Sequence, residues 1–442
     1  MKNHVTIIGG GLAGCEAAWQ LLKRGFAVTL FEMKPLCYSP AHKSPRLAEL
    51  VCSNSLGSNA PDHAAGILKE ELRELGSLIL DAADRTFVPA GRALAVDRNL
   101  FSLFVEEKLG WEKGLTIVRE EVTSIPSDET VIIATGPLTS EAMALTIASL
   151  TGENQIYFYD AISPIIEGDS IDHDKAFPGA RYEPSSDDYL NCPLTRDEYE
   201  RFWQALCTAE EMPLHAFEDM RCFESCLPIE VLAGRGFKTL AFGPMKPVGL
   251  VEPRTGARPY AVVQLRREDR EGRLFNIVGF QTKMLQREQE RVIRLIPGLE
   301  HARFARYGSI HRNTFIASPR LLDSHLRLKG DNNIFFAGQL TGVEGYMEST
   351  AMGLLAGVYA AGILSGRPVS VPPADTAIGS LLKYVTSYEG KNFQPMNINM
   401  GLFPPLEEGG ITRKEKGALI ALRALNAIKK WKADQSPLEG DA

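Results

Sequence analysis

Three glycines near the N-terminus have a spacing that suits the binding of a diphosphate group. Gly9, Gly11 and Gly14 fit the pattern G-x-G-x-x-G, which follows an apolar run over 5–8 and opens a segment with helical spacing over 12–24. Gly9 permits a tight turn, Gly11 lets a pyrophosphate approach the backbone, and Gly14 lets the helix pack closely on the strand. The unpaired N–H groups at the start of the helix attract the pyrophosphate. The pattern therefore predicts a dinucleotide site.

An acidic residue completes this first unit. Glu32 ends a second apolar strand over 27–31 and lies 23 positions after Gly9. Its carboxylate can accept hydrogen bonds from both adenosine ribose hydroxyls and would repel a 2′-phosphate, which disfavours NADP at this site. Strand, glycine turn, helix and strand form a βαβ unit, which implies a parallel sheet. The predicted cofactor contacts here are Gly9, Gly10, Gly11, Leu12, Ala13, Gly14, Glu32 and Met33.

A distant segment indicates which dinucleotide binds. A strand over 333–337 is followed by Gly338, by a turn that ends in Gly345 and Tyr346, and by a helix of small residues from about 348 to 364. This arrangement resembles the second flavin motif of glutathione-reductase-like flavoproteins, where the helix N-terminus stabilises negative charge on the reduced ring. Thr135 and Gly136, after a strand over 131–134, match the same class. The prediction is FAD, with Thr135, Gly136, Gly338, Gly345 and Tyr346 as further contacts.

The two motifs stand at opposite ends of a chain of 442 residues, which is more than one core usually holds. We therefore expect an α/β fold: a discontinuous, glutathione-reductase-like FAD-binding Rossmann domain over 1–160 and 305–442, with an inserted α+β domain over 161–304. A basic amphipathic helix over 412–432 should pack on the first domain. A nicotinamide donor would lack a Rossmann domain of its own, because no second G-x-G-x-x-G is present.

Composition and charge narrow the setting. Seven cysteines in a long chain do not indicate a disulfide framework, so we expect a reducing cytoplasm. No signal peptide is expected, because a strand begins almost at once, and no membrane span, because no apolar run approaches roughly 20 residues. The net charge is −7, yet 254–329 holds 16 Lys and Arg against 7 Asp and Glu, so the rest must carry −16. This asymmetry indicates either a face that meets phosphates or a solvated surface with internal ion pairs.

Six sequence blocks identify a family that the chain resembles. It is similar, from Val5 to about Pro405, to the folate- and FAD-dependent tRNA (uracil-54-C5)-methyltransferases. The blocks are 30–33 (LFEM), 49–55 (ELVCSNS), 134–140 (ATGPLTS), 189–193 (YLNCP), 242–250 (FGPMKPVGL) and 311–314 (HRNT). The resemblance implies transfer of a one-carbon unit from 5,10-methylenetetrahydrofolate to C5 of a uracil in tRNA. It also implies reduced FAD as carrier and reductant, and NADH or NADPH as the electron source.

This chemistry needs a reactive thiol, since C5 of uracil becomes nucleophilic only after a thiolate adds at C6. Cys226 and Cys52 match the family's functional pair. We expect Cys226 to attack C6 and Cys52 to work beside the flavin, with the reverse assignment open. Taken without the resemblance, a cysteine between apolar neighbours is more often a small buried hydrophobe. No metal site is expected, because the pair Cys222 and Cys226 has no second pair at similar spacing.

For several other residues more than one role is possible. Tyr346 could stack on a pterin or fill the core. Lys246 could contact the folate glutamate tail, an RNA phosphate or only solvent. His311 and Arg312 are candidates for RNA or folate contact. Glu344 is a candidate proton acceptor, with an exposed loop carboxylate as the default. Candidate phosphate contacts also include Arg413, Lys414, Lys416, Lys429, Lys430 and Lys432.

Three alternatives to this function stay open. One is an NAD(P)H-dependent flavin oxidoreductase or thiol reductase that uses Cys222 and Cys226 as a dithiol. The second is a non-catalytic RNA-binding flavoprotein, and the third is a relative of the flavoproteins that modify the tRNA wobble uridine.

Overall fold

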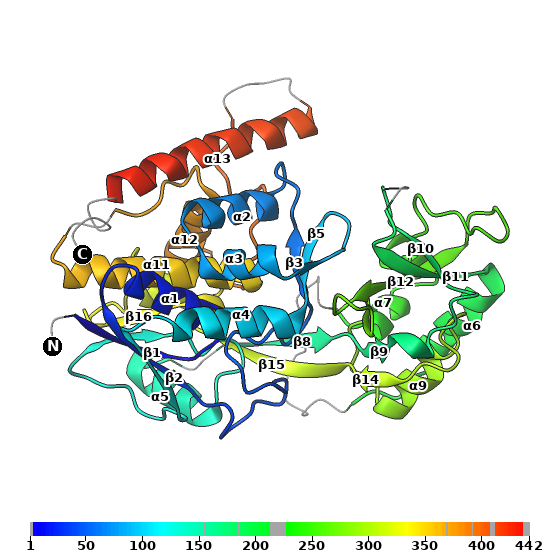
Figure 1. Cartoon of the computed structure of the whole chain (residues 1–442), viewed down its shortest axis with the longest axis horizontal. Coiled ribbons are helices and arrows are strands. Elements are labelled where there is room, and N and C mark those ends of the chain that lie inside the picture. Colours follow the sequence, from blue (N-terminus) through cyan, green and yellow to red (C-terminus); the bar gives the residue numbers. More distant parts are fainter. Residues whose placement is uncertain are drawn as a thin grey trace.

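The computed structural model describes residues 3–153, 156–183, 186–212, 227–367, 370–390, 392–406 and 412–435, without the side chains at 156, 158, 413 and 414. Figure 1 shows a larger part, which carries the first and last described segments, and a smaller part formed by the middle of the sequence. The predicted pair Cys222 and Cys226 lies outside the described residues.

A five-stranded parallel sheet forms the centre of the larger part. Its order is β16-β7-β1-β2-β6, and every neighbouring pair is parallel. The three inner strands are rich in β-branched and apolar residues, as expected where helices cover both faces. The predicted α/β fold with a parallel nucleotide-binding sheet is confirmed. The strands are β1 (His4–Ile8), β2 (Ala27–Glu32), β6 (Leu115–Arg119), β7 (Thr130–Ile133) and β16 (Ile334–Phe336).

Two helices of the larger part pack closely against each other. These are α1 (Leu12–Leu22) and α11 (Tyr346–Leu364). A Cβ added at Gly353 would lie 2.3 Å from the Ala13 carbonyl oxygen, so the backbones meet without room for a side chain. By length and composition α11 could cross a membrane, contrary to the expectation from the sequence, but 89% of its most apolar 18-residue stretch is buried in this core.

Further helices complete the larger part, and Figure 1 shows α13 lying along α2 at its outer edge. The predicted basic helix is α13, and Lys432 Nζ donates to the Glu74 carbonyl oxygen at 2.7 Å. Glu71 accepts the backbone N–H groups of Ala377 and Ile378, which begin α12. The helices are α2 (Ala64–Glu74), α3 (Leu78–Arg85), α4 (Arg98–Gly110), α5 (Glu141–Thr151), α10 (Ser318–Leu321), α12 (Ala377–Ser387) and α13 (Arg413–Gln435).

The smaller part has its own antiparallel sheet and its own hydrophobic core. The strand order is β10-β11-β12-β13-β9-β14. The strands are β9 (Ile165–Glu167), β10 (Phe177–Gly179), β11 (Tyr189–Leu194), β12 (Ala261–Arg267), β13 (Leu274–Ile277) and β14 (Phe304–Arg306). Its helices are α6 (Arg196–Cys207), α7 (Ile229–Gly234), α8 (Thr239–Phe242) and α9 (Gln286–Ile293).

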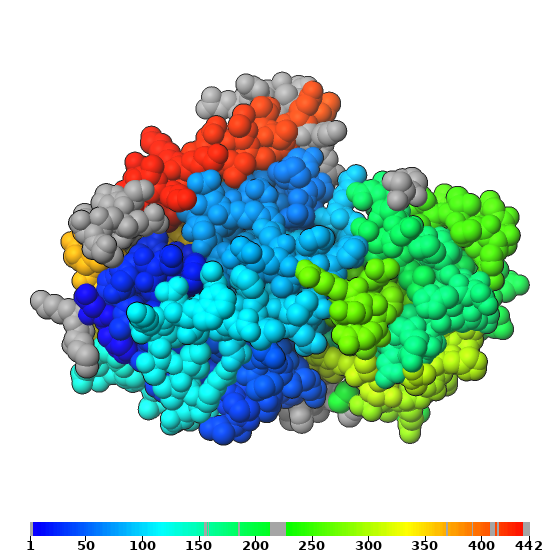
Figure 2. Space-filling model, viewed as in Figure 1, coloured from blue at the N-terminus to red at the C-terminus, as the bar shows by residue number. Residues whose placement is uncertain are grey.

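An antiparallel ribbon links the two parts. It consists of β8 (Ile156–Ile162) and β15 (Ser309–Phe315), one leading into the smaller part and the other leading back. A three-stranded sheet of β3 (Ser55–Ser58), β5 (Ala93–Val96) and β4 (Phe87–Val88) belongs to the larger part. Figure 2 shows the smaller part, in green, packed directly against the larger part, in blue and cyan. The Tyr189 hydroxyl donates to the Ala90 carbonyl oxygen at 2.8 Å across this contact.

Candidate functional site: a nucleotide cleft and an adjoining thiol cavity

The glycine turn after β1 forms the floor of an elongated cleft. Gly9 has a φ of +109°, and a Cβ there would lie 2.5 Å from the Ala134 carbonyl oxygen. A Cβ at Gly14 would lie 1.8 Å from the Gly9 carbonyl oxygen, so α1 packs on the turn only without a side chain. Gly11, at the start of α1, would meet no protein atom within 4 Å. Its open face and the uncapped N-terminus of α1 leave room and N–H donors for a diphosphate.

Glu32 is fixed at the end of β2 by two backbone donors. Gly10 N–H donates to Oε2 at 3.1 Å and Lys34 N–H donates to Oε1 at 3.0 Å. The residue is buried and its carboxylate lines the cleft. Because each oxygen has a second lone pair, the carboxylate can still accept from two ribose hydroxyls. The surroundings of Glu32 thus fit the adenosine end of a dinucleotide.

The opposite wall comes from the ends of β7 and β16. Thr135 and Gly136 line the cleft, and the Thr139 hydroxyl donates to the Gly136 carbonyl oxygen at 2.7 Å. Gly338 has a φ of +74°, and a Cβ there would lie 2.7 Å from the Ala13 Cβ. The predicted cofactor contacts that line this cleft are Gly9, Gly10, Gly11, Leu12, Ala13, Glu32, Met33, Thr135, Gly136, Gly338 and Tyr346. Gly14 packs behind the turn instead, and Gly345 lines the neighbouring cavity.

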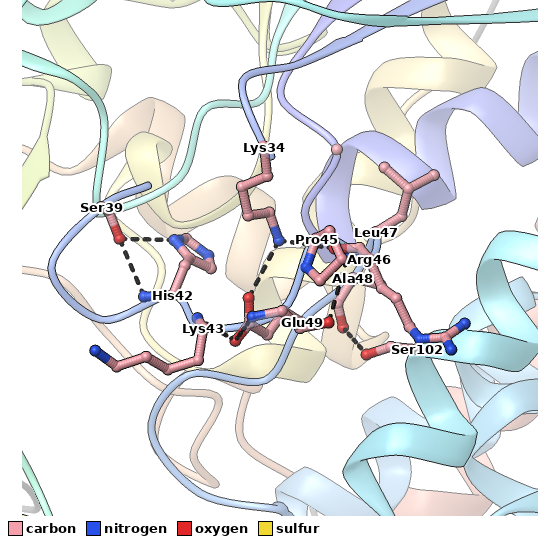
Figure 3. Close-up of polar contacts among 12 residues, drawn as sticks. Lys34, Ser39, His42, Lys43, Pro45, Arg46, Leu47, Ala48, Glu49 and Ser102 are labelled. Carbon is pink, nitrogen blue, oxygen red and sulfur yellow. Dashed lines mark hydrogen bonds and ion pairs between the residues drawn. The ribbon is translucent and has the colours of Figure 1, made fainter. Parts of the chain in front are cut away.

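A loop over 34–49 borders the cleft, and no sequence motif before Glu49 indicated its role. Figure 3 shows Lys34 and Glu49 pointing toward each other across the base of this loop. Lys34 Nζ donates to the Arg46 carbonyl oxygen at 2.7 Å and pairs with Glu49 Oε2 at 3.2 Å. Ala48 N–H donates to the Gly10 carbonyl oxygen at 2.9 Å, which joins the loop to the glycine turn. The internal ion pair therefore fixes the path of the chain from the cleft to Cys52.

His42 occupies the same loop and also lines the cleft. Its Nδ1 lies 2.6 Å from the Ser39 hydroxyl oxygen (Figure 3). Burial and the nearby charge of Lys34 lower the pKa of His42 to about 4. The imidazole is therefore neutral at neutral pH.

A second cavity, of about 470 Å³, adjoins the cleft and contains Cys52. Its volume is within the range of small-molecule sites, roughly 300–1,000 Å³. The two hollows share lining residues, which are Val51, Pro137, Leu138, Gln339 and Tyr346. The predicted site residues brought together here are Cys52, His311, Glu344, Gly345 and Tyr346. A molecule in the cleft and another in this cavity would therefore meet at Tyr346.

Tyr346 stands at this shared wall and binds the Cys52 segment directly. Cys52 N–H donates to the Tyr346 hydroxyl oxygen at 2.9 Å, and Ser53 N–H donates to it at 3.3 Å. Burial raises the pKa of the phenol, which stays protonated. The ring is thus held beside both hollows. Its stacking on a pterin stays a prediction.

Buried polar side chains hold the backbone of Cys52 from the other side. Arg98, at the start of α4, donates to the Cys52 carbonyl oxygen at 3.1 Å and forms an ion pair with Glu268 of the smaller part. Arg266 of β12 donates to Asn54 Oδ1 at 2.8 Å and to the Ser53 hydroxyl at 2.7 Å. The segment 52–54 is therefore anchored by residues from both parts of the molecule.

The Cys52 thiol is protonated in this environment. Burial, followed by the charge of Asp160, raises its pKa, whereas Arg98 and Arg306 act in the opposite direction. Cys15, by contrast, packs in the core of α1 and donates to the Gly10 carbonyl oxygen at 3.3 Å, as expected for a structural cysteine. Within the described residues no group of three His, Cys, Asp or Glu side chains could hold a metal ion.

Glu344 differs from its default expectation. The expectation of an exposed loop carboxylate is wrong, because the residue is only 7% exposed and Gln339 Nε2 donates to its Oε2 at 2.5 Å. Burial raises its pKa well above the usual value, and the charges of Asp160 and Glu348 raise it further. Glu348, on the first turn of α11, has its pKa raised to about 7 by burial. Glu344 therefore takes up a proton more readily than an exposed carboxylate does.

The three predicted substrate contacts do not lie together. His311 lines the Cys52 cavity, and its Nε2 lies 2.7 Å from the Ser309 hydroxyl oxygen. Burial and Arg306 lower the pKa of His311 to about 4. Arg312, the next residue of β15, is exposed, and its guanidinium lies 4.4 Å from the centre of the Tyr157 ring. Lys246 lines a separate, larger cavity in the smaller part.

The basic segment 254–329 is not one cationic face. Nine of its sixteen cations form ion pairs within the described residues, several of them with acidic residues outside the segment, such as Glu167 and Glu210. The paired residues are Arg254, Arg273, Lys283, Arg287, Arg291, Arg294, Arg303, Arg320 and Arg327. Only the cations without such partners remain candidates for contact with an external phosphate.

A protein-family model and a solved structure match this chain in sequence and fold, respectively. Residues 4–368 match the family model described as "Glucose inhibited division protein A". The solved structure of Aquifex aeolicus GidA, in its form II crystal, superposes with a TM-score of 0.69 at 18% identity; the match covers 98% of this chain and 75% of that one. At this identity the likeness shows the fold alone.

Sequence relatives are much more similar. The methylenetetrahydrofolate--tRNA-(uracil-5-)-methyltransferase TrmFO of Syntrophus aciditrophicus is 59% identical, over 98% of this chain and 99% of the relative. The TrmFO of Geobacter sulfurreducens is 56% identical, over 98% of this chain and 100% of the relative. Both matches extend over almost the whole length of the chain. The chain therefore belongs to the TrmFO family of methylenetetrahydrofolate--tRNA-(uracil-5-)-methyltransferases.

Proposed function

We propose that this protein transfers the one-carbon unit of 5,10-methylenetetrahydrofolate to C5 of uracil-54 in tRNA and forms 5-methyluridine there. The observation that carries the proposal is the shared wall between the nucleotide cleft and the Cys52 cavity. A two-substrate reaction of this kind needs a cofactor ring on one side of the wall and a reactive thiol on the other. The names of the relatives supply the folate donor and the tRNA substrate.

FAD is the proposed occupant of the cleft. Glu32 would hold the adenosine ribose, the N-terminus of α1 at Gly11 the pyrophosphate, and the turn at Gly338 the chain that leads to the ring. Bound there, FAD would supply the redox chemistry and the carrier function of the reaction, with NADH or NADPH as the proposed electron source. Gly345 and Tyr346, at the N-terminus of α11, line the Cys52 cavity, so the partial positive charge of this helix end lies at the cavity.

Cys226 and the residues that line the Cys52 cavity have distinct proposed roles. Cys226, which lies outside the described residues, is assigned the attack on C6, and Cys52 the work at the flavin side, on the family resemblance; the reverse assignment is tested below. Addition of a thiolate at C6 places negative charge on the uracil O4. Burial raises the pKa of Glu344, and in its protonated form this side chain would donate a hydrogen bond or a proton to that oxygen. This is the opposite of the proton-acceptor role considered from the sequence.

Tyr346 and Arg98 would keep this arrangement in place. The hydroxyl of Tyr346 accepts from the Cys52 backbone, so its ring stays at the wall where a pterin would approach the flavin. Arg98 fixes the Cys52 carbonyl and is itself fixed by Glu268. The five described cysteines are free, which supports the proposed reducing cytoplasmic setting.

The proposal is tested with the FAD-bound protein and an unmodified tRNA transcript. The mixture contains NADH or NADPH and methylenetetrahydrofolate labelled in its one-carbon unit, and the digested RNA is analysed for labelled 5-methyluridine. A transcript with cytidine at position 54 is the matched control. We expect label only with uridine at that position. Absence of label while the flavin is reduced would overturn the proposed function.

A further inference from the structure

A large hollow lies in the smaller part and has no lining residue in common with the nucleotide cleft or the Cys52 cavity. Its volume is about 1,170 Å³, above the usual range of roughly 300–1,000 Å³ for small-molecule pockets. The start of α6, the helix α8 and the loop over 246–260 form its walls. A hollow of this size on the surface suits part of a large ligand.

The charges that line this hollow are unequal in availability. Its three carboxylates are already engaged within the described residues. Glu198 accepts from the backbone N–H of Thr195, Glu252 pairs with Arg254 at 2.6 Å, and Glu300 pairs with Lys175 at 2.6 Å.

Four other cations in the lining form no ion pair with any residue that the structure describes. They are Arg196, Lys238, Lys246 and Arg258. Lys246 instead lies with its Nζ 5.6 Å from the centre of the Tyr182 ring. The uncompensated charge of the hollow is therefore positive, although the whole chain carries −7.

An exposed aromatic ring accompanies these cations. Phe242, at the end of α8, lines the hollow and is 78% exposed, the highest value among the large apolar side chains of the described residues. Phosphate-facing cations beside an exposed ring are the combination that binds single-stranded nucleic acid, because the cations follow the backbone and a base stacks on the ring.

The loop that carries Lys246 is stiff. Arg181 donates to the Pro244 carbonyl oxygen at 2.8 Å and to the Val262 carbonyl oxygen at 3.3 Å. These two bonds fix the backbone just before and just after the loop over 246–260. Met245, the preceding residue, is fully buried. A cation held on a rigid loop loses little conformational freedom when it binds.

We infer that this hollow is a second RNA-binding site, at which Lys246, Arg258 and their unpaired neighbours hold backbone phosphates of the tRNA outside the methylated loop and Phe242 stacks on an unpaired base. The inference rests on the proposed function for the identity of the RNA. It assigns Lys246 to RNA and not to the folate tail, because Lys246 does not line the Cys52 cavity.

The test measures binding of full-length tRNA transcript to the FAD-bound protein at several salt concentrations. For Lys246→Gln combined with Arg258→Gln we expect the Kd to rise about tenfold, and the slope of log Kd against log salt to fall by about 1 for each residue. The swapped pair Lys246→Arg with Arg258→Lys should restore both. Phe242→Ala should raise the Kd without a change in slope. Phe242→Tyr keeps an aromatic ring and should leave the Kd at the parent value.

Lys108→Gln is the matched control. Lys108 is a half-buried lysine that also lies over an aromatic ring, that of Trp111 at 5.6 Å, but it belongs to α4 in the larger part. Its loss removes one positive charge, as Lys246→Gln alone does, and should leave the Kd and the slope near the parent values. In turnover, the loss in the double variant should fall on KM for tRNA and not on kcat.

Each outcome bears on the inference. A double variant that binds tRNA with the parent Kd and salt slope would overturn it, as would an equal loss in Lys108→Gln. If the double variant loses affinity and salt slope as expected but the parent protein transfers no label to uridine, the proposed function fails and the second site stands. Circular dichroism and a thermal melt like those of the parent, together with unchanged FAD content, show that the fold of each variant is intact.

Discussion

The nucleotide cleft and the Cys52 cavity share a wall at Tyr346, yet the chain builds them in different ways. Backbone atoms make the cleft: a Cβ at Gly9 or Gly14 would collide with a carbonyl oxygen, whereas Gly11 leaves an open face. Side chains make the cavity: Arg98 of α4, together with Arg266 and Glu268 at the end of β12, holds the backbone around Cys52. The cleft is thus specified within short stretches of sequence, and the cavity by contacts between distant ones.

This difference predicts how each hollow fails. A change in the cleft acts through steric overlap with the backbone and should be severe or confined to cofactor binding. A change around Cys52 acts through the loss of buried polar partners, so it should lower stability or activity by amounts that depend on which partner is left unpaired.

The largest expected effect is at Gly14. Gly14→Ala places a Cβ 1.8 Å from the Gly9 carbonyl oxygen, which neither strand β1 nor helix α1 can relieve without moving. We expect a cost above the usual overpacking range of about 1–3 kcal/mol, with loss of soluble folded protein. Circular dichroism and a thermal melt measure it. A variant that melts at the parent temperature would contradict the close packing of α1 on the turn.

Arg98→Ala should have the next largest effect. It leaves Glu268 buried without its ion-pair partner and frees the Cys52 carbonyl, so we expect the free energy of unfolding to fall by about 3–5 kcal/mol. Urea unfolding gives the value. Arg85→Ala is the matched control, since Arg85 pairs with Asp81 at the surface and such pairs contribute about 0–1 kcal/mol. Equal losses in the two variants would mean that the buried pair does not anchor the segment.

Gly11→Ala separates folding from cofactor binding. The added Cβ meets no protein atom within 4 Å, so the protein should fold, but it would stand where a pyrophosphate approaches the start of α1. Loss of a hydrogen bond to a charged group costs about 1.5–3 kcal/mol, so FAD affinity should fall roughly 10- to 150-fold. Flavin titration followed by fluorescence tests this. Gly110→Ala on α4, where a Cβ also meets nothing, should bind FAD like the parent.

The smallest effect concerns the pH dependence of stability. Burial raises the pKa of Glu348 to about 7 in the folded protein, against about 4.3 in an unfolded chain. Between these values the folded state holds a proton that the unfolded state has released, so the free energy of unfolding falls as pH rises through this window. Glu348→Gln removes this titration. The difference in free energy of unfolding, variant minus parent, should therefore be larger at pH 8 than at pH 5, by about 1–3 kcal/mol.

Urea midpoints at the two pH values provide the measurement for Glu348. The carboxyl faces Lys69, whose pKa burial lowers to about 8, and Glu344. Glu70→Gln, also on α2, is the control, because Glu70 is less buried and pairs with Arg73 at 2.7 Å. A parent and a Glu348→Gln variant with parallel pH profiles would show that Glu348 ionises normally.

Much of the fold follows from the sequence because it depends on local patterns. The strands before and after the glycine turn, expected over 5–8 and 27–31, span His4–Ile8 and Ala27–Glu32. The helix expected from about 348 begins at Tyr346, since the turn at Gly345 is already the start of its first turn. The boundaries proposed for the inserted domain, 161 and 304, stay predictions.

The site was less accessible to sequence reasoning, for a physical reason. Burial of Glu344, the ion pair of Lys34 with Glu49, and the contact of Arg98 with Glu268 all depend on residues that are distant in sequence or on surfaces that form only in the folded chain. The nearest signal was the block 49–55, which carries Glu49 and Cys52 together. Lys246 lies in another hollow, which no spacing in the sequence indicates.

The most direct test of the account uses Cys52→Ala in the FAD-bound protein. With labelled methylenetetrahydrofolate and tRNA transcript, we expect normal FAD binding and a loss of labelled 5-methyluridine of roughly 10²- to 10⁴-fold, whereas Cys207→Ala, at the exposed end of α6, should act like the parent. RNA with 5-fluorouracil should still form a covalent complex with Cys52→Ala, and its loss there would reverse the roles of the two cysteines. Methylation by Cys52→Ala at the parent rate would contradict the claim that this cavity is the active site.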